Sequence, residues 1–364
     1  MPLAEISCAA PGNGPIQTKE FRLFPRLLRV LALIVAGGLS IVPVEASTPI
    51  TIIVSGLEKQ IYLPAILAER LGYFADEGLD VRLLNATAGV EAQNELLTGA
   101  AQGVVGFYDH TIALQGRGNY VVSLVQFARA PGEVELVAEP LAERITSASQ
   151  LKGLRLGVAG LGSSTDFLTR YIAHLNGLKF GDYRMIPFEA GNRFIEAMKQ
   201  GKIDAGMTTE PTAGRLLKTT GAKVLIDLRT PESTWAVIGG CYPGAAFYVR
   251  ASWLSAHREE AGKLAMAFVR AMHYIAAHGA AEIADQLPND YFEGDKPLYV
   301  ERLSESKAMF TADGRMPSGC PETTLKVLSS FSKALREKEI DLRQTYTTEF
   351  VDAAEKTLAA SEKN

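Results

Sequence analysis

The sequence lacks the local signatures that catalytic and metal-binding proteins most often show. Its three cysteines form no C-x-x-C pair, and its five histidines include no pair at the i, i+4 spacing with the glutamate that marks zinc proteases. It has no G-x-S-x-G turn and no P-loop. No strong motif therefore indicates zinc, thiol-redox, hydrolase or nucleotide chemistry, and we expect no metal and no cofactor.

Basic residues are not in excess either. The chain has 37 Lys and Arg against 41 Asp and Glu, a formal net charge of −4, so no basic surface indicates a nucleic acid partner. Beyond residue 46 no apolar run approaches the roughly 20 residues that a membrane-spanning helix needs. With 47% hydrophobic and 21% charged residues, the composition is typical of a soluble globular protein of about two domains.

The first 46 residues have the order of a secretory signal peptide. Four basic residues between positions 19 and 29 precede an apolar, charge-free run over 30–44, and Val44-Glu45-Ala46 resembles a cleavage site. A membrane anchor is the alternative, but glycines and Pro43 interrupt the run. We predict a signal peptide over 1–46, with an N-terminal extension, and export to the periplasm.

Two cysteines, Cys241 and Cys320, remain after such a cleavage, because Cys8 lies in the leader. An oxidising compartment permits a disulfide between them. Two separate thiols are the other expectation.

After Pro49 short apolar runs alternate with helical patterns. Examples of the runs are "ITIIVSG" (50–56), "GVVGFYDH" (103–110), "LRLGVAG" (154–160) and "IDAGMTTEP" (203–211). Strands alternating with helices predict parallel pairing in an α/β fold. Ligands of such folds sit beyond the carboxyl ends of the strands.

The pattern restarts near residue 147, which predicts two lobes facing a cleft. We assign 47–140 to lobe 1, 141–241 to lobe 2, and 242–364 to a return into lobe 1 followed by C-terminal helices. Patterns such as "REEAGKLAMAFVRAMHYIAAHG" predict that this last segment is mostly helical.

Several phrases in one order resemble a known family. "PAILAERLGYFADEGLDVRL" (64–83), "LKGLRLGVAGLGSST" (151–165) and "AMKQGKIDAGMTTEP" (197–211) are similar to periplasmic substrate-binding proteins of nitrate-, sulfonate- and taurine-type ABC importers. The resemblance covers roughly 50–249. It implies a type II periplasmic-binding-protein fold, two lobes on a two-strand hinge, and a monomer that delivers a small molecule to a permease with a cytoplasmic ATPase.

The same resemblance implies no catalysis. Pyrimidine synthases related to the family use a cysteine-rich cluster that this sequence lacks, which disfavours that branch. "YDHT" (108–111) is less typical of the sulfonate and nitrate members. An enzyme on the same fold, such as a lyase, and a ligand sensor subunit remain alternatives.

The turn "GLGSST" (160–165) is the first candidate site. Gly162, Ser163, Ser164 and Thr165 lead onto a predicted helix, where N–H groups and hydroxyls can hold a sulfonate, carboxylate or phosphate. An ordinary helix N-cap is the simpler interpretation. A dinucleotide site is disfavoured, because the third glycine of G-x-G-x-x-G is missing.

Other loops at the same edges supply the remaining candidates. We expect ligand contacts from Lys59, Gln60 and Tyr62 in lobe 1, from Tyr108, Asp109 and His110 in lobe 1, and from Asn192 and Glu210 in lobe 2. Asp109 could instead cap a helix, and His110 could satisfy an internal neighbour. For Arg193 we favour surface charge, and for Trp235 and Tyr242 either core packing or an aromatic wall. The expected ligand is a small organic anion: a sulfonate, a carboxylate or a related nitrogen compound.

Overall fold

The computed structural model describes residues 49–361. The account below concerns these residues. The predicted signal peptide lies outside the described residues. None of the helices in residues 49–361 is long and apolar enough to cross a membrane.

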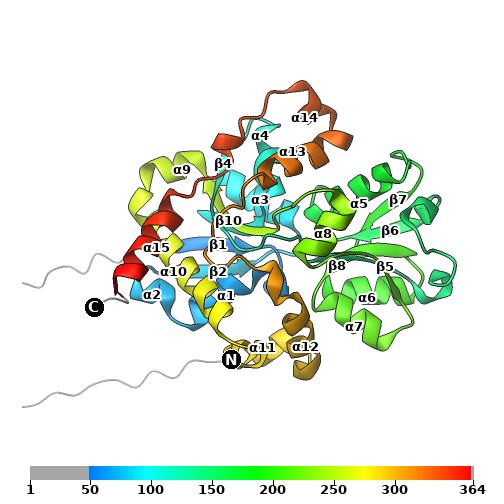
Figure 1. The fold of residues 1–364 in the computed structure, drawn as a ribbon, viewed down its shortest axis with the longest axis horizontal. Helices are drawn as coiled ribbons and strands as arrows, with labels where there is room; N and C mark the ends of the chain where they lie inside the picture. Colours follow the sequence, from blue (N-terminus) through cyan, green and yellow to red (C-terminus); the bar gives the residue numbers. More distant parts are fainter. Residues whose placement is uncertain (1–48, 362–364) are drawn as a thin grey trace, which may run out of the picture. The chain divides into compact units, whose positions relative to one another are not determined.

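The first lobe is built on a five-stranded sheet in the order β2-β1-β3-β10-β4 (Figure 1). Its strands are β1 (Ile50–Val54), β2 (Val81–Asn85), β3 (Gly103–Phe107), β4 (Val121–Gln126) and β10 (Ala245–Arg250). β1 pairs in parallel with β2 and β3, whereas β10 runs antiparallel to β3 and β4. The prediction of purely parallel pairing is therefore wrong for β10, because this strand enters from the other lobe.

The second lobe has a matching sheet in the order β7-β6-β8-β5-β9. Its strands are β5 (Glu133–Val137), β6 (Arg155–Val158), β7 (Arg184–Pro187), β8 (Ala205–Thr209) and β9 (Lys223–Leu228). β5 is the antiparallel member and pairs with β8 and β9. The predicted boundary at 140 placed β5 in lobe 1, but its hydrogen bonds place it in the second sheet.

Helices cover both sheets. Their bounds are α1 (Leu63–Arg70), α2 (Tyr73–Asp76), α3 (Gly89–Thr98), α4 (Asp109–Gln115), α5 (Ser164–Leu175), α6 (Gly191–Lys199), α7 (Thr212–Thr219), α8 (Pro231–Ile238), α9 (Ala251–Ala256), α10 (Arg258–Ala277), α11 (Ala280–Ala284), α12 (Lys296–Ser306), α13 (Cys320–Phe331), α14 (Lys333–Glu337) and α15 (Glu349–Ser361). The long helix α10 buries its apolar side on the first sheet. There Phe268 contacts Phe74, Phe127 and Phe247, with ring centroids 5.3, 5.0 and 4.8 Å away.

Two crossing segments, residues 127–132 and 239–244, join the lobes and lie side by side. The Gly244 amide donates to the Ala128 carbonyl at 2.9 Å, and the Ala128 amide donates to Ala245 at 3.0 Å. The Gln126 side chain also donates to the Ala128 and Ala245 carbonyls. A Cβ at position 244 would lie 2.4 Å from the Ala130 carbonyl oxygen, so this close approach requires glycine. This paired crossing is the geometry of a two-strand hinge.

A third connection, the C-terminal strap, is formed by α13 and α14 (residues 320–337). A disulfide between Cys241 and Cys320 attaches the first residue of the strap to the second crossing segment. Of the two expectations for these cysteines, the structure has the disulfide and not two separate thiols. Leu328 and Leu335 of the strap share one apolar cluster with Ile112 of α4 and Phe167 of α5. The strap therefore contacts both lobes (Figure 1).

Candidate functional site

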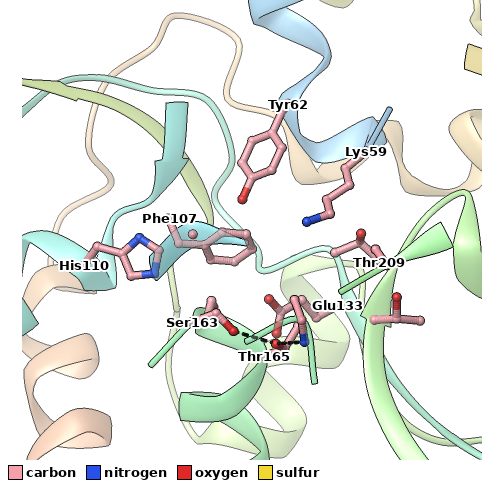
Figure 2. Close-up of a pocket in the computed structure, with 13 residues that line it drawn as sticks. Lys59, Tyr62, Phe107, His110, Glu133, Ser163, Thr165 and Thr209 are labelled. Atoms are coloured by element: carbon pink, nitrogen blue, oxygen red, sulfur yellow. Dashed lines mark hydrogen bonds between the residues drawn. The ribbon is translucent and has the colours of Figure 1, made fainter. Parts of the chain in front are cut away.

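A small cavity lies between the lobes, where β1, β3, β6 and β8 end (Figure 2). The centre of a water-sized sphere can move within about 20 Å³ of this cavity, so the cavity has room for about one water molecule. Both lobes line it, with Lys59, Tyr62, Gly89, Phe107, His110, Glu133, Ala159, Ser163, Ser164, Thr165, Ala190, Thr208 and Thr209. A wider hollow of about 670 Å³ adjoins it at Ala159. In this arrangement of the lobes the cavity leaves little room for a solute larger than water.

Lys59 is the cation of this cavity. It follows β1 and folds back over Gly56, where a Cβ would lie 2.5 Å from the lysine Cε. Its ammonium donates to the Ser55 carbonyl at 2.6 Å and forms no ion pair among the described residues. Burial lowers the pKa of Lys59, and nearby carboxylates partly oppose this. Figure 2 shows its nitrogen directed into the cavity, beside the Tyr62 hydroxyl.

Glu133 is the carboxyl group that faces this lysine from the other lobe. It begins β5, is 1% exposed, and its Oε2 has no hydrogen-bond partner in residues 49–361. Burial and the charge of Asp109 raise its pKa well above the usual range, whereas Ser164 and Lys59 lower it. The cavity thus places one cation and one carboxyl on opposite lobes.

Asp109 and His110 begin α4 behind the cavity. The Tyr242 hydroxyl donates to Asp109 Oδ2 at 2.7 Å, and burial raises the pKa of Asp109 to about 6. His110 Nδ1 lies 3.2 Å from the Tyr248 hydroxyl, and burial lowers the pKa of His110 to about 3. His110 is therefore a neutral cavity residue at ordinary pH. Asp109 forms no side-chain cap on α4, contrary to that expectation.

The predicted anion cradle is largely closed on itself. The amides of Ala159 and Gly160 donate to the hydroxyls of Thr165 and Ser163, and the Gly162 amide donates to Asp166 Oδ2 at 2.9 Å. The Ser163 and Thr165 hydroxyls also bond each other at 2.8 Å (Figure 2). The glycine amides are thus already used, and the residues that reach the cavity from this turn are Ser163, Ser164 and Thr165.

Of the predicted contacts, the cavity brings together Lys59, Tyr62, His110, Ser163, Ser164 and Thr165. Gln60, Tyr108, Asp109, Gly162, Asn192 and Glu210 do not line it, because other groups bind most of their polar atoms. Gln60 donates to the Tyr299 carbonyl, the Tyr108 hydroxyl lies 2.6 Å from Thr345 Oγ1, and Asn192 accepts from Arg215. Glu210 accepts from Arg229 and from the Gly214 amide.

The sequence analysis also weighed Arg193, Tyr242 and Trp235, and the structure gives each of them different surroundings. Arg193 is 73% exposed and pairs with Glu189, as favoured above. Tyr242 is fully buried. Trp235 is 61% exposed on α8, so it neither packs in the core nor lines the cavity, contrary to both expectations.

Sequence reasoning missed seven cavity residues: Gly89, Phe107, Glu133, Ala159, Ala190, Thr208 and Thr209. Thr208 and Thr209 end β8, immediately before the Glu210 that we had selected. The rule that ligands bind at the carboxyl ends of strands could have found both threonines. Glu133 begins β5, where Glu133 and Glu135 alternate with apolar residues, and this pattern alone did not mark it as a cavity residue.

Glu135, two residues along β5, predicts a pH-dependent stability. Burial raises its pKa to about 8 from an ordinary 4.5, although the Thr169 hydroxyl lowers it. Between pH 4.5 and 8 the folded state holds a proton that the unfolded state releases, so stability falls as pH rises through this window. Relative to the original protein, we expect Glu135→Gln to gain on the order of 2 kcal/mol between pH 5 and pH 8.5.

Urea unfolding at several pH values measures this gain. Glu143→Gln, at a side chain 85% exposed, is the control and should show no such trend. Parallel stability–pH curves for Glu135→Gln and the original protein would show that Glu135 titrates normally.

The described part of the chain holds no group of three or more His, Cys, Asp and Glu residues arranged to bind a metal.

The family model described as NMT1/THI5 like matches residues 61–281. A curated relative, the 4-amino-5-hydroxymethyl-2-methylpyrimidine phosphate synthase of Aspergillus parasiticus, is 26% identical over 305 residues, 80% of this chain and 83% of the relative. The putative binding protein YtlA of Bacillus subtilis is 26% identical over 249 residues, 67% of this chain and 71% of the relative.

Solved structures share the fold. A protein of Bordetella bronchiseptica RB50 is 30% identical with a TM-score of 0.82, covering 85% of this chain and 98% of that one. The nitrate-binding protein NrtA of Synechocystis PCC 6803 is 14% identical with a TM-score of 0.69, covering 85% and 89%. The aliphatic sulphonate-binding protein SsuA of Escherichia coli is 18% identical with a TM-score of 0.62, covering 82% and 96%. The predicted α/β fold of type II periplasmic binding proteins is confirmed.

One prediction is contradicted. We expected no catalysis and disfavoured the pyrimidine synthase branch, yet curated relatives at 26% and 29% identity are named as pyrimidine phosphate synthases. The missing cysteine cluster therefore does not separate this chain from relatives that are enzymes.

Proposed function

Because this chain belongs to the NMT1/THI5-like family, we propose that it is the solute-binding component of an ABC importer. In this proposal the protein is exported to the periplasm as a monomer. It takes a small solute between its lobes by hinge closure and delivers it to a permease that a cytoplasmic ATPase drives.

The observation that carries the proposal is a small cavity beside a two-strand hinge, lined from both lobes and containing several buried polar side chains. Lys59 comes from the first lobe and Glu133 from the second, so a solute between them contacts both and stabilises the closed form. The backbone amide of Gln60 also donates to the backbone carbonyl of Glu210 at 3.1 Å, and this hydrogen bond joins the two lobes directly.

We propose the predicted residues that line the cavity as solute contacts. The other predicted residues support the site: Gln60 and Glu210 join the lobes, Tyr108 and Asp109 anchor α4, and Gly162 and Asn192 hold loops of lobe 2. The small organic anion expected from the sequence would place its acidic group at Lys59.

A thermal unfolding screen tests this function. The panel contains sulfonates, aromatic carboxylates, nitrate and pyrimidines, and a solute at 100 times its Kd adds about 2.7 kcal/mol of stability. Replacing both Ser163 and Ser164 by leucine should remove the shift, whereas Ser149→Leu at an exposed position should keep it. Import is supported when cellular uptake of that compound requires this gene. Unchanged uptake in a deletion strain would contradict it.

The names of the curated relatives favour a second candidate, an enzyme that acts on a pyrimidine-like compound in the same cavity. Incubation of the stabilising compound with the protein, followed by mass spectrometry, separates the two. A new product formed in proportion to protein concentration supports the enzyme, and recovery of the compound together with gene-dependent uptake supports the importer.

A further inference from the structure

The cavity holds more acceptor groups than its predicted role as an anion site requires. Glu133 Oε2 and the hydroxyls of Thr208 and Thr209 line the cavity and are buried without a hydrogen-bond partner in residues 49–361. The glycine amides that were expected to bind an anion are used within the turn. A buried acceptor that finds no donor costs free energy, so a solute that supplies a donor gains what these atoms lack.

Lys59 and Glu133 face each other across the cavity without forming an ion pair. The ammonium has three donors, of which one is used on the Ser55 carbonyl. A group placed between these residues can therefore accept from Lys59 and donate to Glu133 Oε2. The Thr208 and Thr209 hydroxyls, which are buried and line the same wall, can accept further donors.

We propose that the solute carries a donor-bearing nitrogen, an amine, amidine or ring amino group, which binds Glu133, together with an acceptor or anionic end, which binds Lys59. This inference rests on the proposed function and names the chemical class of its solute. A plain organic anion satisfies Lys59 but offers no donor to Glu133 Oε2. A pure cation satisfies Glu133 but meets the ammonium of Lys59. Glu133 is thus the residue that determines specificity.

The electrostatics of the site support this assignment. Burial disfavours the charged form of Glu133, and nearby Lys59 and Ser164 favour it. Asp109 and Glu135 add negative charge that opposes ionisation of Glu133. A nitrogen donor, above all a protonated one, offsets that repulsion, whereas an added anion increases it.

Matched pairs of compounds test the proposal. In each pair a methyl group replaces the amino group, so that only one member carries the donor: taurine and propane-1-sulfonate, 4-aminobenzoate and 4-methylbenzoate, 4-aminopyrimidine and 4-methylpyrimidine. Affinities are measured by titration calorimetry on the full folded protein. We expect the amino member of the binding pair to be favoured by about 100-fold, because a site built for an N–H donor rejects an analogue without one.

Variants then locate the effect. Glu133→Met, which removes the acceptor, should reduce the preference within the pair to less than about threefold, and Glu133→Asp should keep a preference of at least about tenfold. Glu143→Met, on the exposed surface of the same lobe, is the control. Thermal midpoints show whether each variant is folded, and Glu133→Asp supplies the test if Glu133→Met is not.

Equal affinity for both members of the binding pair would overturn the inference and leave the proposed function standing. A preference that survives in folded Glu133→Met would likewise overturn the role of Glu133. Absence of binding by every pair would contradict the inference, while gene-dependent uptake in the preceding section still decides the proposed function.

Discussion

Lys59→Met is expected to weaken solute binding by about 30-fold to several thousand-fold, the equivalent of about 2–5 kcal/mol for losing one partner of a buried charged contact. Lys59 is 6% exposed and lines the cavity, so no water replaces its ammonium cheaply for the acceptor end of the solute. Methionine fills nearly the same volume without a donor. Titration calorimetry with the compound found in the screen measures the loss.

The fold should tolerate this change. Burial already lowers the pKa of Lys59, which shows that the protein disfavours its charge. Removing that charge relieves a desolvation cost, so the unfolding midpoint should stay constant or rise. Lys152→Met, at a side chain 71% exposed, is the matched control and should bind normally. Unchanged affinity in Lys59→Met would remove Lys59 from the site.

Lys59 was predictable because its position follows from strand topology. It lies in the loop after the first strand, and in α/β sheets that edge carries the ligand. The same rule placed His110 and the Ser163–Thr165 turn correctly at the cavity. The two-lobed fold followed from a strand–helix pattern that restarts, and from three phrases in family order.

Glu133 was not predictable from the same pattern. Glu133 and Glu135 alternate with Val134 and Leu136, which in sequence is typical of a strand with one face in solvent. In the structure β5 lies between β8 and β9, and both of its faces are buried. Its polar face meets the cavity and the Thr169 hydroxyl of α5. Only the position of β5 within the sheet, which sequence alone does not give, distinguishes these arrangements.

Gln60 and Tyr108 show a second limit. Both follow strands at the correct edge, yet their side chains bond Tyr299 and Thr345, which lie 239 and 237 residues away in the sequence. Those partners come from the C-terminal segment, where the sequence predicted helices but no contacts. A polar residue at a strand end is therefore a solute contact only when no distant segment satisfies it first.

The second large effect is expected at the C-terminal strap. Cys320→Ser removes the disulfide with Cys241, whose sequence separation is 79 residues. A crosslink over such a long loop restricts the unfolded chain strongly, so we expect the free energy of unfolding to fall by about 2–4 kcal/mol. Urea unfolding with and without a reductant measures it. The reductant should lower the stability of the original protein and leave the variant unchanged.

The same disulfide is the covalent attachment of the strap to the hinge. It attaches α13 to the second crossing segment, while Leu328 and Phe167 pack the strap on lobe 2 and Ile112 belongs to lobe 1. Without the disulfide, the strap keeps its apolar contacts and loses its attachment to the hinge. Local opening should then precede global unfolding, and hydrogen exchange should rise in residues 239–244 and 320–331 before it rises in β1 or β3. Exchange that rises equally everywhere would show that the bond stabilises the whole fold without a special role at the hinge.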